Sequence, residues 1–233
     1  MIPLHDDNPT DIYPVFTVSI IAVCVLVYLF QLTLGPSATR ALIYSLGVIP
    51  AVLLNKASLP PEIVLVSPPM TVITSMFMHG GFMHLAGNML YLWIFGNNVE
   101  DAMGHLRFII FYTLCGFAAV AGQVMQNPDS LIPMVGASGA ISGVLGAYVL
   151  LYPHARVLVL LPLGFYAHLV RIPAQFVLGI WFLLQIISSI VSNPEQGGVA
   201  WYAHIAGFVA GLLLVVVFKR RNVKLFHSRQ RGS

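Results

Sequence analysis

Long apolar segments with almost no charges constrain this chain more than any other feature of its sequence. Hydrophobic residues make up 58% of the 233 residues, whereas Asp, Glu, Lys and Arg together make up only 8%. A soluble globular domain carries roughly 25% charged residues, so this composition is typical of an integral membrane protein. Neither Asn-Gly hairpins nor ten-residue alternating strands occur, which disfavours a β-barrel. We therefore expect an all-α membrane protein.

The apolar segments predict a bundle of six transmembrane helices in a single domain. Each segment is compared with the roughly 20 apolar residues that a helix needs to cross the hydrocarbon core. The six lie at about 14–35, 82–102, 105–127, 137–152, 172–193 and 199–218, and the fourth is short. The six-helix domain (14–218) is expected to follow a cytoplasmic segment (1–13) and to precede a basic cytoplasmic tail (219–233).

Two further apolar stretches are not expected to cross the membrane. The connection 36–70 between the first two spans is apolar and broken by proline, so we expect this first loop to lie in the membrane interface. The stretch Val157–Leu163 is too short to span, and we interpret it as re-entrant or interfacial.

The positions of Lys and Arg predict the orientation of the bundle. Of the eleven, six follow the last span, and Arg107, Arg156 and Arg171 lie in connections on that same side. Only Arg40 and Lys56 fall on the opposite side. Cytoplasmic loops carry such an excess of basic residues, so both termini are expected to be cytoplasmic. We interpret the basic tail as an anchor to anionic lipid rather than as a nucleic-acid-binding segment.

The N-terminal segment indicates a compartment, and the positions of the two cysteines argue against a disulfide. Met1–Asp11 contains neither Lys nor Arg, and the apolar run after it is too long for the core of a signal peptide. With neither a transit peptide nor a soluble domain before the first span, the sequence favours a bacterial inner membrane, and a compartment-specific eukaryotic form stays open as the alternative. Cys24 and Cys115 both fall inside predicted spans, where we expect buried apolar residues rather than a disulfide.

A serine and a histidine inside predicted spans point to chemistry. Gly136-Ala137-Ser138-Gly139 opens the fourth span, and Ala203-His204 lies near the start of the sixth, followed by Gly207 and Gly211. A serine hydroxyl attacks a carbonyl when a base takes its proton, and histidine is the usual base. Each group alone also has a structural interpretation, because serine bonds to helix carbonyls and glycine packs helices together. The two interpretations are compatible, since short side chains meet only where backbones approach closely.

Three predicted spans place polar groups at a similar depth. His84 and Asn88 are four residues apart and so share one face of the second span, and His79 precedes that helix beside Gly80-Gly81. With the orientation above, the second, fourth and sixth spans all begin on the non-cytoplasmic side. The side chains of His84, Asn88, Ser138 and His204 are therefore expected in one layer just below that membrane face.

This layer also offers hydrogen-bond donors for the oxyanion that a serine hydrolase must stabilise. Ser138 at a helix N-terminus supplies unpaired backbone N–H groups, the Asn88 amide and the His84 imidazole add side-chain donors, and Gly136 permits a tight turn. No acidic residue falls in the layer, so the site is expected to be a Ser–His dyad. There is neither an HExxH motif nor an intramembrane Asp pair, which disfavours a zinc or aspartyl mechanism.

These residues resemble the rhomboid intramembrane serine proteases over nearly the whole chain. The resemblance rests on four motifs: Gly136-Ala137-Ser138-Gly139, His84-x-x-x-Asn88, Ala203-His204-x-x-Gly207-x-x-x-Gly211 and Glu100-Asp101-x-x-Gly104 after the second span. It implies Ser138 as the nucleophile and His204 as the base. It also implies an oxyanion hole formed by His84, Asn88 and the Ser138 backbone N–H, with His79 as a supporting group.

The resemblance further implies a fold, a substrate class and one open question. The fold is a six-transmembrane-helix rhomboid-like bundle with 36–70 as the interfacial loop and the fifth span as a substrate gate. The substrates are membrane-anchored proteins cut within or near their transmembrane segment, and the reaction needs no metal or cofactor. In some rhomboids the residue four after the nucleophile is aromatic and stacks on the histidine. Here it is Ser142, so what orients His204 is open.

Two other classes of protein remain as alternatives. A rhomboid-like pseudoprotease binds transmembrane segments without cleaving them, but such proteins typically lack the serine or the histidine, and both are present here. A transporter or channel would use His84 and His204 as a proton relay. Transporter folds often carry internal repeats, and none is visible in this sequence.

Overall fold

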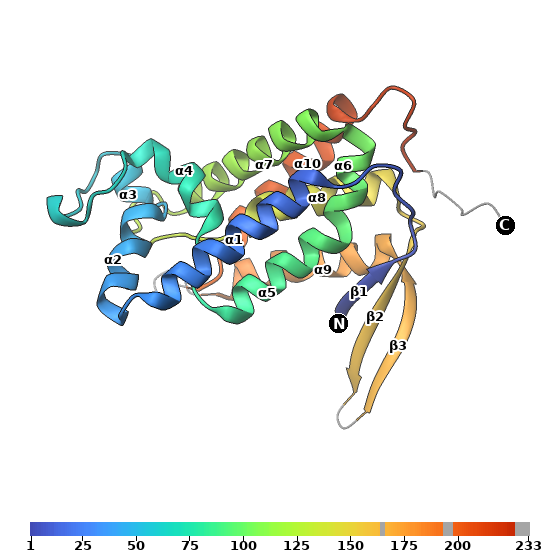
Figure 1. The fold of residues 1–233 in the computed structure, drawn as a ribbon, viewed down its shortest axis with the longest axis horizontal. Helices are drawn as coiled ribbons and strands as arrows, with labels where there is room; N and C mark the ends of the chain where they lie inside the picture. The colour runs from blue at the N-terminus through green and yellow to red at the C-terminus, as the bar shows by residue number, and fades with distance from the viewer. Residues whose placement is uncertain (164–165, 193–197, 227–233) are drawn as a thin grey trace.

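The computed structural model describes residues 1–163, 166–192 and 198–226 (Figure 1). Most of the described chain is helical, and its long helices run side by side in one bundle. The expected spans coincide with α1 (Val15–Thr33), a continuous helical segment made of α5 (Phe82–Tyr91), the π-helical turn η4 (Leu92–Gly96) and α6 (Asn97–Met103), α7 (His105–Gln126), α8 (Ser138–Leu151), α9 (Ala174–Val191) and α10 (Trp201–Phe218).

The lengths and surfaces of these helices fit a membrane. Within the described residues, α1, α7, α9 and α10 are each long and apolar enough to cross one. The helical segments Pro61–Phe77 and Phe82–Met103, which meet at a 78° bend, add a fifth candidate if they form one span, whereas α8 has only 14 residues. Large apolar side chains on the outer faces are exposed, for example Leu26 (64%) on α1 and Val217 (76%) on α10. Such surfaces suit lipid rather than water.

The connection between the first two spans folds as a series of short helices. They are α2 (Pro36–Leu46), α3 (Pro50–Leu53), η1 (Pro61–Ile63), η2 (Pro68–Met70), α4 (Thr71–Thr74) and η3 (Ser75–Phe77). Figure 1 shows this region at one end of the bundle, with β1 and the end of α10 toward the other. Val48 and Met134 exchange backbone hydrogen bonds of 3.0 and 2.7 Å, which tie the region to the loop before α8. Its expected position in the membrane interface stays a prediction.

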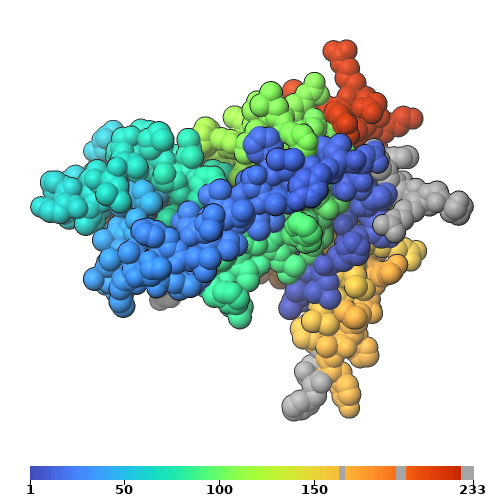
Figure 2. Space-filling view, viewed as in Figure 1, coloured from blue at the N-terminus to red at the C-terminus, as the bar shows by residue number. Residues whose placement is uncertain are grey.

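A three-stranded sheet is the main departure from the expected all-helical fold. β1 (Ile2–Asp6), β2 (Arg156–Leu163) and β3 (Tyr166–Pro173) form an antiparallel sheet in the order β1-β2-β3. Figure 2 shows β2 and β3 projecting from the helical body. The stretch expected to be re-entrant or interfacial is thus a strand, whose Val157 and Val159 are buried against the bundle and pair with Ile172 and Val170.

Acidic side chains fasten the N-terminal end of α1 to the end of α6. The carboxylate of Glu100, fully buried, accepts hydrogen bonds from the backbone N–H groups of Phe16 (2.9 Å) and Thr17 (2.8 Å). These are first-turn donors of α1, which have no partner within the helix itself. Asp101 pairs with Arg220, so the start of the basic tail packs against α6. Gly104, with φ +81°, makes the sharp turn from α6 into α7.

A buried polar network joins the sheet to the bundle. Asp6 on β1 accepts hydrogen bonds from the Tyr148 hydroxyl (2.5 Å) and the Asn98 amide (2.9 Å), and Asn8 donates to Asn98 (2.6 Å). Burial raises the pKa of the Asp6 carboxyl to about 6, and the Tyr148 hydrogen bond opposes this only in part. The first strand is therefore part of the packed structure, and the cytoplasmic location of residues 1–13 stays a prediction.

The closest helix contact lies between α8 and α10. A Cβ added at Gly207 would overlap the carbonyl oxygen of Gly139, and one added at Gly211 would overlap that of Gly143. The two backbones therefore touch, as small-residue packing in membranes permits. Gly139 follows Ser138, and Gly207 lies one turn beyond His204. This helix contact therefore brings the side chains of Ser138 and His204 together.

Candidate functional site

Ser138 and His204 meet at the start of α8 and α10. The Nε2 atom of His204 lies 2.8 Å from the Oγ atom of Ser138, which is hydrogen-bond distance. His204 is buried and Ser138 is partly buried. The amide oxygen of Gln123 on α7 accepts a hydrogen bond from the Ala203 backbone N–H (3.3 Å) and so holds the first turn of α10 in place. The arrangement allows proton transfer between the serine hydroxyl and the imidazole.

The far nitrogen of His204 contacts a residue that sequence reasoning missed. Its Nδ1 atom lies 2.8 Å from Oε1 of Gln185 on α9, and the Gln185 side chain is buried. The rings of Trp181 and Trp201 flank the imidazole at centroid distances of 6.0 and 6.1 Å. An amide in the middle of a mostly apolar span was the available signal, but nothing in the sequence pattern directed it toward His204.

Ser142 does not touch the imidazole through its hydroxyl. Instead, its Oγ donates to the Ser138 carbonyl oxygen one turn earlier at 2.6 Å. This is the usual local bond of a serine in a helix. The orientation of His204, left open by the sequence, therefore comes from Gln185 and the neighbouring tryptophan rings.

His84 and Asn88 face the same point from α5. Gly136 lies beside both, because a Cβ added there would lie 2.7 Å from Nε2 of His84 and 3.6 Å from Nδ2 of Asn88. Its φ of +125° is a conformation that glycine adopts without strain. Asn88 is buried, and its Nδ2 atom has no hydrogen-bond partner among the described residues. Asn88 lines the same cavity as Ser138, and a buried unpaired donor in such a cavity is suited to bind a substrate oxygen.

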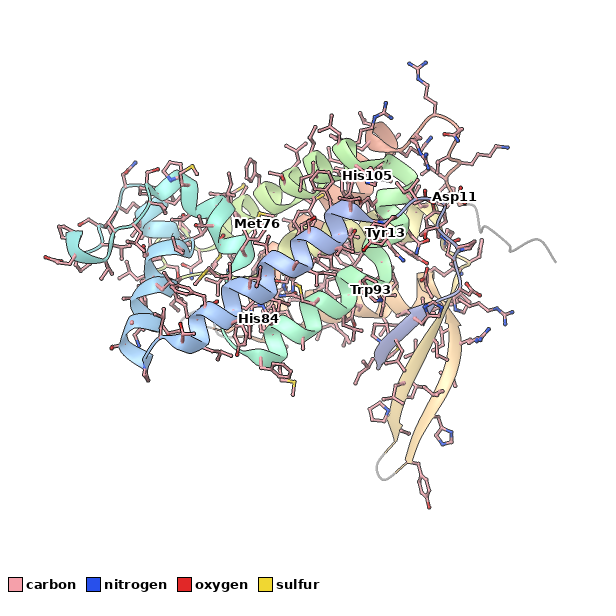
Figure 3. All side chains as sticks on the ribbon, in the orientation of Figure 1. Asp11, Tyr13, Met76, His84, Trp93 and His105 are labelled. Atoms are coloured by element: carbon pink, nitrogen blue, oxygen red, sulfur yellow. The ribbon has the colours of Figure 1, made fainter. Side chains whose placement is uncertain are left out.

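His84 is the more open of these two donors. Its side chain is exposed and lines the cavity, and Figure 3 places it on α5 toward the end of the bundle that carries α2. The Gly80 backbone N–H approaches its Nδ1 atom at 3.5 Å, the long limit of a hydrogen bond. If Nδ1 is the acceptor, Nε2 carries the proton and is a donor on the Gly136 side.

His79 is buried next to His84. Its ring is 1% exposed and lies edge-on to His84 at a centroid distance of 5.2 Å. Its backbone is held by Gln31 on α1, which donates to the His79 carbonyl (3.0 Å) and accepts from the His79 N–H (3.3 Å). His79 therefore packs against a side chain of the site and does not itself reach Ser138 through any contact in the described structure.

An open cavity of about 1140 Å³ is lined by His84, Asn88, Ser138 and His204. Its wall is apolar near Ile141, Leu145 and Trp181, and it is polar where Gln126 and Asn127 approach it. A cavity of this size accommodates a segment of extended peptide together with water. None of the described residues in its lining is acidic, and no cluster of metal-ligating side chains is found in the described ranges.

Comparisons with known proteins agree on one family. The sequence model of the Rhomboid domain matches residues 68–221, which is more than half of the chain. Similar proteins include the yeast Rhomboid protein 1, mitochondrial (Saccharomyces cerevisiae), which is 29% identical over 160 residues, covering 64% of this chain and 41% of that protein. The Rhomboid protease GluP of Bacillus subtilis is 31% identical over 140 residues, covering 60% of this chain and 24% of that protein.

A human relative gives a similar result. The Presenilin-associated rhomboid-like protein, mitochondrial (Homo sapiens) is 32% identical over 105 residues, covering 43% of this chain and 26% of that protein. In each of these three comparisons the matched part spans less than half the length of the relative.

Proposed function

The chain belongs to the rhomboid family, and from this premise we propose that it is an intramembrane serine endopeptidase acting through a dyad of Ser138 and His204. Its substrates are membrane-anchored proteins, cut within or near their transmembrane segment. Family membership supports intramembrane protease activity in general. The observation that carries the finer proposal is the 2.8 Å contact between His204 Nε2 and Ser138 Oγ beside a cavity.

The chemistry follows the general course of serine hydrolysis. His204 Nε2 takes the hydroxyl proton as Ser138 Oγ attacks a peptide carbonyl carbon, giving a tetrahedral intermediate. The imidazolium then protonates the leaving amine, and the acyl-enzyme forms. A water molecule then attacks the acyl carbon and gives a proton to His204 Nε2. As the bond from that carbon to Ser138 Oγ breaks, the imidazolium returns the proton to Oγ and the carboxylic acid product leaves. No metal or other cofactor takes part in this proposal.

The oxyanion is stabilised by donors that are already in position. The unpaired Asn88 Nδ2, the His84 imidazole and the Ser138 backbone N–H at the start of α8 converge near Gly136. Donors fixed before the reaction need not reorganise as charge develops, which is the basis of their effect. The contact of Gly139 with Gly207, and of Gly211 with α8, holds nucleophile and base at this separation, while His79 supports His84.

The membrane arrangement is part of the same proposal. Six segments cross the bilayer, with the short α8 enclosed by longer helices and both termini cytoplasmic. The region 36–70 then lies in the opposite interface, and α9 borders the path by which a substrate helix enters. A bacterial inner membrane stays the predicted location, and the relatives include both bacterial and mitochondrial proteins.

Cleavage in proteoliposomes tests the proposal. Purified protein is reconstituted with a fluorescently tagged single-span reporter, and the products are analysed by mass spectrometry. We expect cleavage near the reporter's transmembrane segment, and its loss in Ser138→Ala and in His204→Ala. Ser142→Ala, one turn along the same helix, is the matched control and should still cleave. Full cleavage by either variant of the dyad would contradict the assignment, and intact reporter with the wild type would favour a non-cleaving rhomboid-like binding protein.

A further inference from the structure

Gln185 is the one polar side chain outside the proposed dyad and oxyanion hole that bonds directly to His204 in the described structure. It projects from α9, and its side chain is 6% exposed. Its Oε1 atom lies 2.8 Å from His204 Nδ1, the same separation as that between His204 Nε2 and Ser138 Oγ. Serine, imidazole and amide therefore form a continuous chain across α8, α10 and α9.

A second hydrogen bond fixes which end of the amide faces the histidine. The Nε2 group of Gln185 donates to the carbonyl oxygen of Trp181, one turn earlier on α9, at 3.1 Å. Only the NH2 end of a carboxamide is able to donate to a carbonyl, so the oxygen must be the end that faces His204. An amide oxygen accepts and does not donate, so His204 Nδ1 must carry a proton to complete the bond.

The protonation of Nδ1 determines the state of the other nitrogen. In a neutral imidazole one nitrogen is a donor and the other an acceptor. With the proton on Nδ1, the lone pair of Nε2 points at the Ser138 hydroxyl, which is the form that a general base requires. Resting on the proposed function, we propose that Gln185 is a positioning residue that selects this tautomer and holds it through the catalytic cycle.

The other neighbours of His204 are unable to supply this selection. Trp181 and Trp201 restrict the plane of the imidazole by packing, but an aromatic face does not distinguish a protonated from an unprotonated ring nitrogen in the way an oxygen acceptor does. The hydroxyl of Ser142 is directed to the Ser138 carbonyl. Gln185 thus occupies the place that a carboxylate fills in a Ser–His–Asp triad, without its charge.

The test combines activity with a direct measurement of the tautomer. Gln185→Leu removes the acceptor at similar volume, and Gln185→Glu restores an acceptor oxygen. Gln175→Leu, on the same helix at its cytoplasmic-side end, is the matched control. Because one neutral hydrogen bond is lost, we expect kcat of Gln185→Leu to fall roughly tenfold with KM changed less than about twofold. Gln185→Glu should recover most of kcat, and Gln175→Leu should match the wild type.

The tautomer is read by nitrogen NMR of 15N-histidine-labelled protein in lipid, with His204 assigned by difference from His204→Gln. We expect a protonated Nδ1 and an unprotonated Nε2 in the wild type and in Gln175→Leu, and a mixture of both tautomers in Gln185→Leu. A wild-type His204 protonated on Nε2, or an unchanged spectrum and kcat in Gln185→Leu, would overturn the proposal.

The two proposals fail in different ways. A wild type that neither cleaves the reporter nor reacts with a serine probe refutes the protease assignment, while the tautomer experiment still reports on Gln185. An active wild type with an unaffected Gln185→Leu refutes only the role of Gln185. If Gln185→Leu does not fold, the spectrum of the folded Gln185→Glu variant decides. Retention of the signal from protonated His204 Nδ1 in that variant supports the proposal, and loss of that signal contradicts it.

Discussion

Replacing Glu100 should loosen the bundle because this carboxylate caps a helix that lies far away in the sequence. In Glu100→Ala, the backbone N–H groups of Phe16 and Thr17 lose their acceptor, and each orphaned buried donor costs about 1–3 kcal/mol. Thr17 is buried, whereas Phe16 is only partly so and water satisfies its N–H in part. The half-exposed His105, 2.6 Å from Glu100, adds little. The expected loss in the free energy of unfolding is about 3 kcal/mol.

The chain itself carries the reporters for this assay. Cys24 on α1 and Cys115 on α7 are free and fully buried, so a thiol-reactive dye labels them only as the bundle opens. Unfolding in graded denaturant is followed by this labelling. The midpoint of unfolding should fall strongly in Glu100→Ala. In Glu100→Gln, which keeps one acceptor oxygen, it should fall by about half as much. Glu62, exposed on η1, supplies the control, and Glu62→Ala should stay within about 0.5 kcal/mol of the wild type. A Glu100→Ala curve that coincides with that of Glu62→Ala would refute the capping role.

Three further predictions address packing, the oxyanion site and pH. Gly207→Val should push α10 away from the Gly139 carbonyl and lower reporter cleavage about 100-fold or more, whereas Gly179→Ala, with open space around its position, should cleave normally. Asn88→Ala should lower kcat by roughly 10²–10³ while the protein stays folded; a change confined to KM would argue against an oxyanion role. Because the pKa of Asp6 is raised from 3.8 to about 6, the folded protein binds the extra proton, so this group favours folding more as pH falls through 6 toward 4. The free energy of unfolding, measured between pH 4 and pH 8, should carry this pH-dependent contribution in the wild type and lack it in Asp6→Asn. Parallel plots of that free energy against pH for the two proteins would contradict the prediction.

The helices were predictable because their apolar length is a local property of the sequence. The predicted second span ended at residue 102 and α6 ends at Met103, and the predicted fifth began at 172 where α9 begins at Ala174. The sheet was not predictable in this way. The partners of Val157–Leu163 come from residues 2–6 and from the strand that ends at Pro173, and a short apolar run does not reveal whether it will pair.

The same contrast between local and long-range information applies to the candidate site. Ser138, His204, His84 and Asn88 were placed at one depth from helix position and orientation, and the structure brings them around Gly136. Gln185 escaped notice because depth alone does not give the direction in which a side chain leaves its helix. That direction depends on how α9 packs against α10, which involves contacts between distant residues. Ser142 gave no clue to the orientation of His204, because its hydroxyl bonds locally to the Ser138 carbonyl oxygen.

Covalent labelling of the purified protein in detergent or lipid tests the central claim most directly. A fluorophosphonate reacts with a serine whose proton is removed by a neighbouring base, and peptide mass spectrometry locates the adduct. We predict one adduct on Ser138, absent from Ser138→Ala, strongly reduced in His204→Ala and retained in Ser142→Ala. An unlabelled wild type, or equal labelling of wild type and His204→Ala, would contradict a Ser138–His204 dyad.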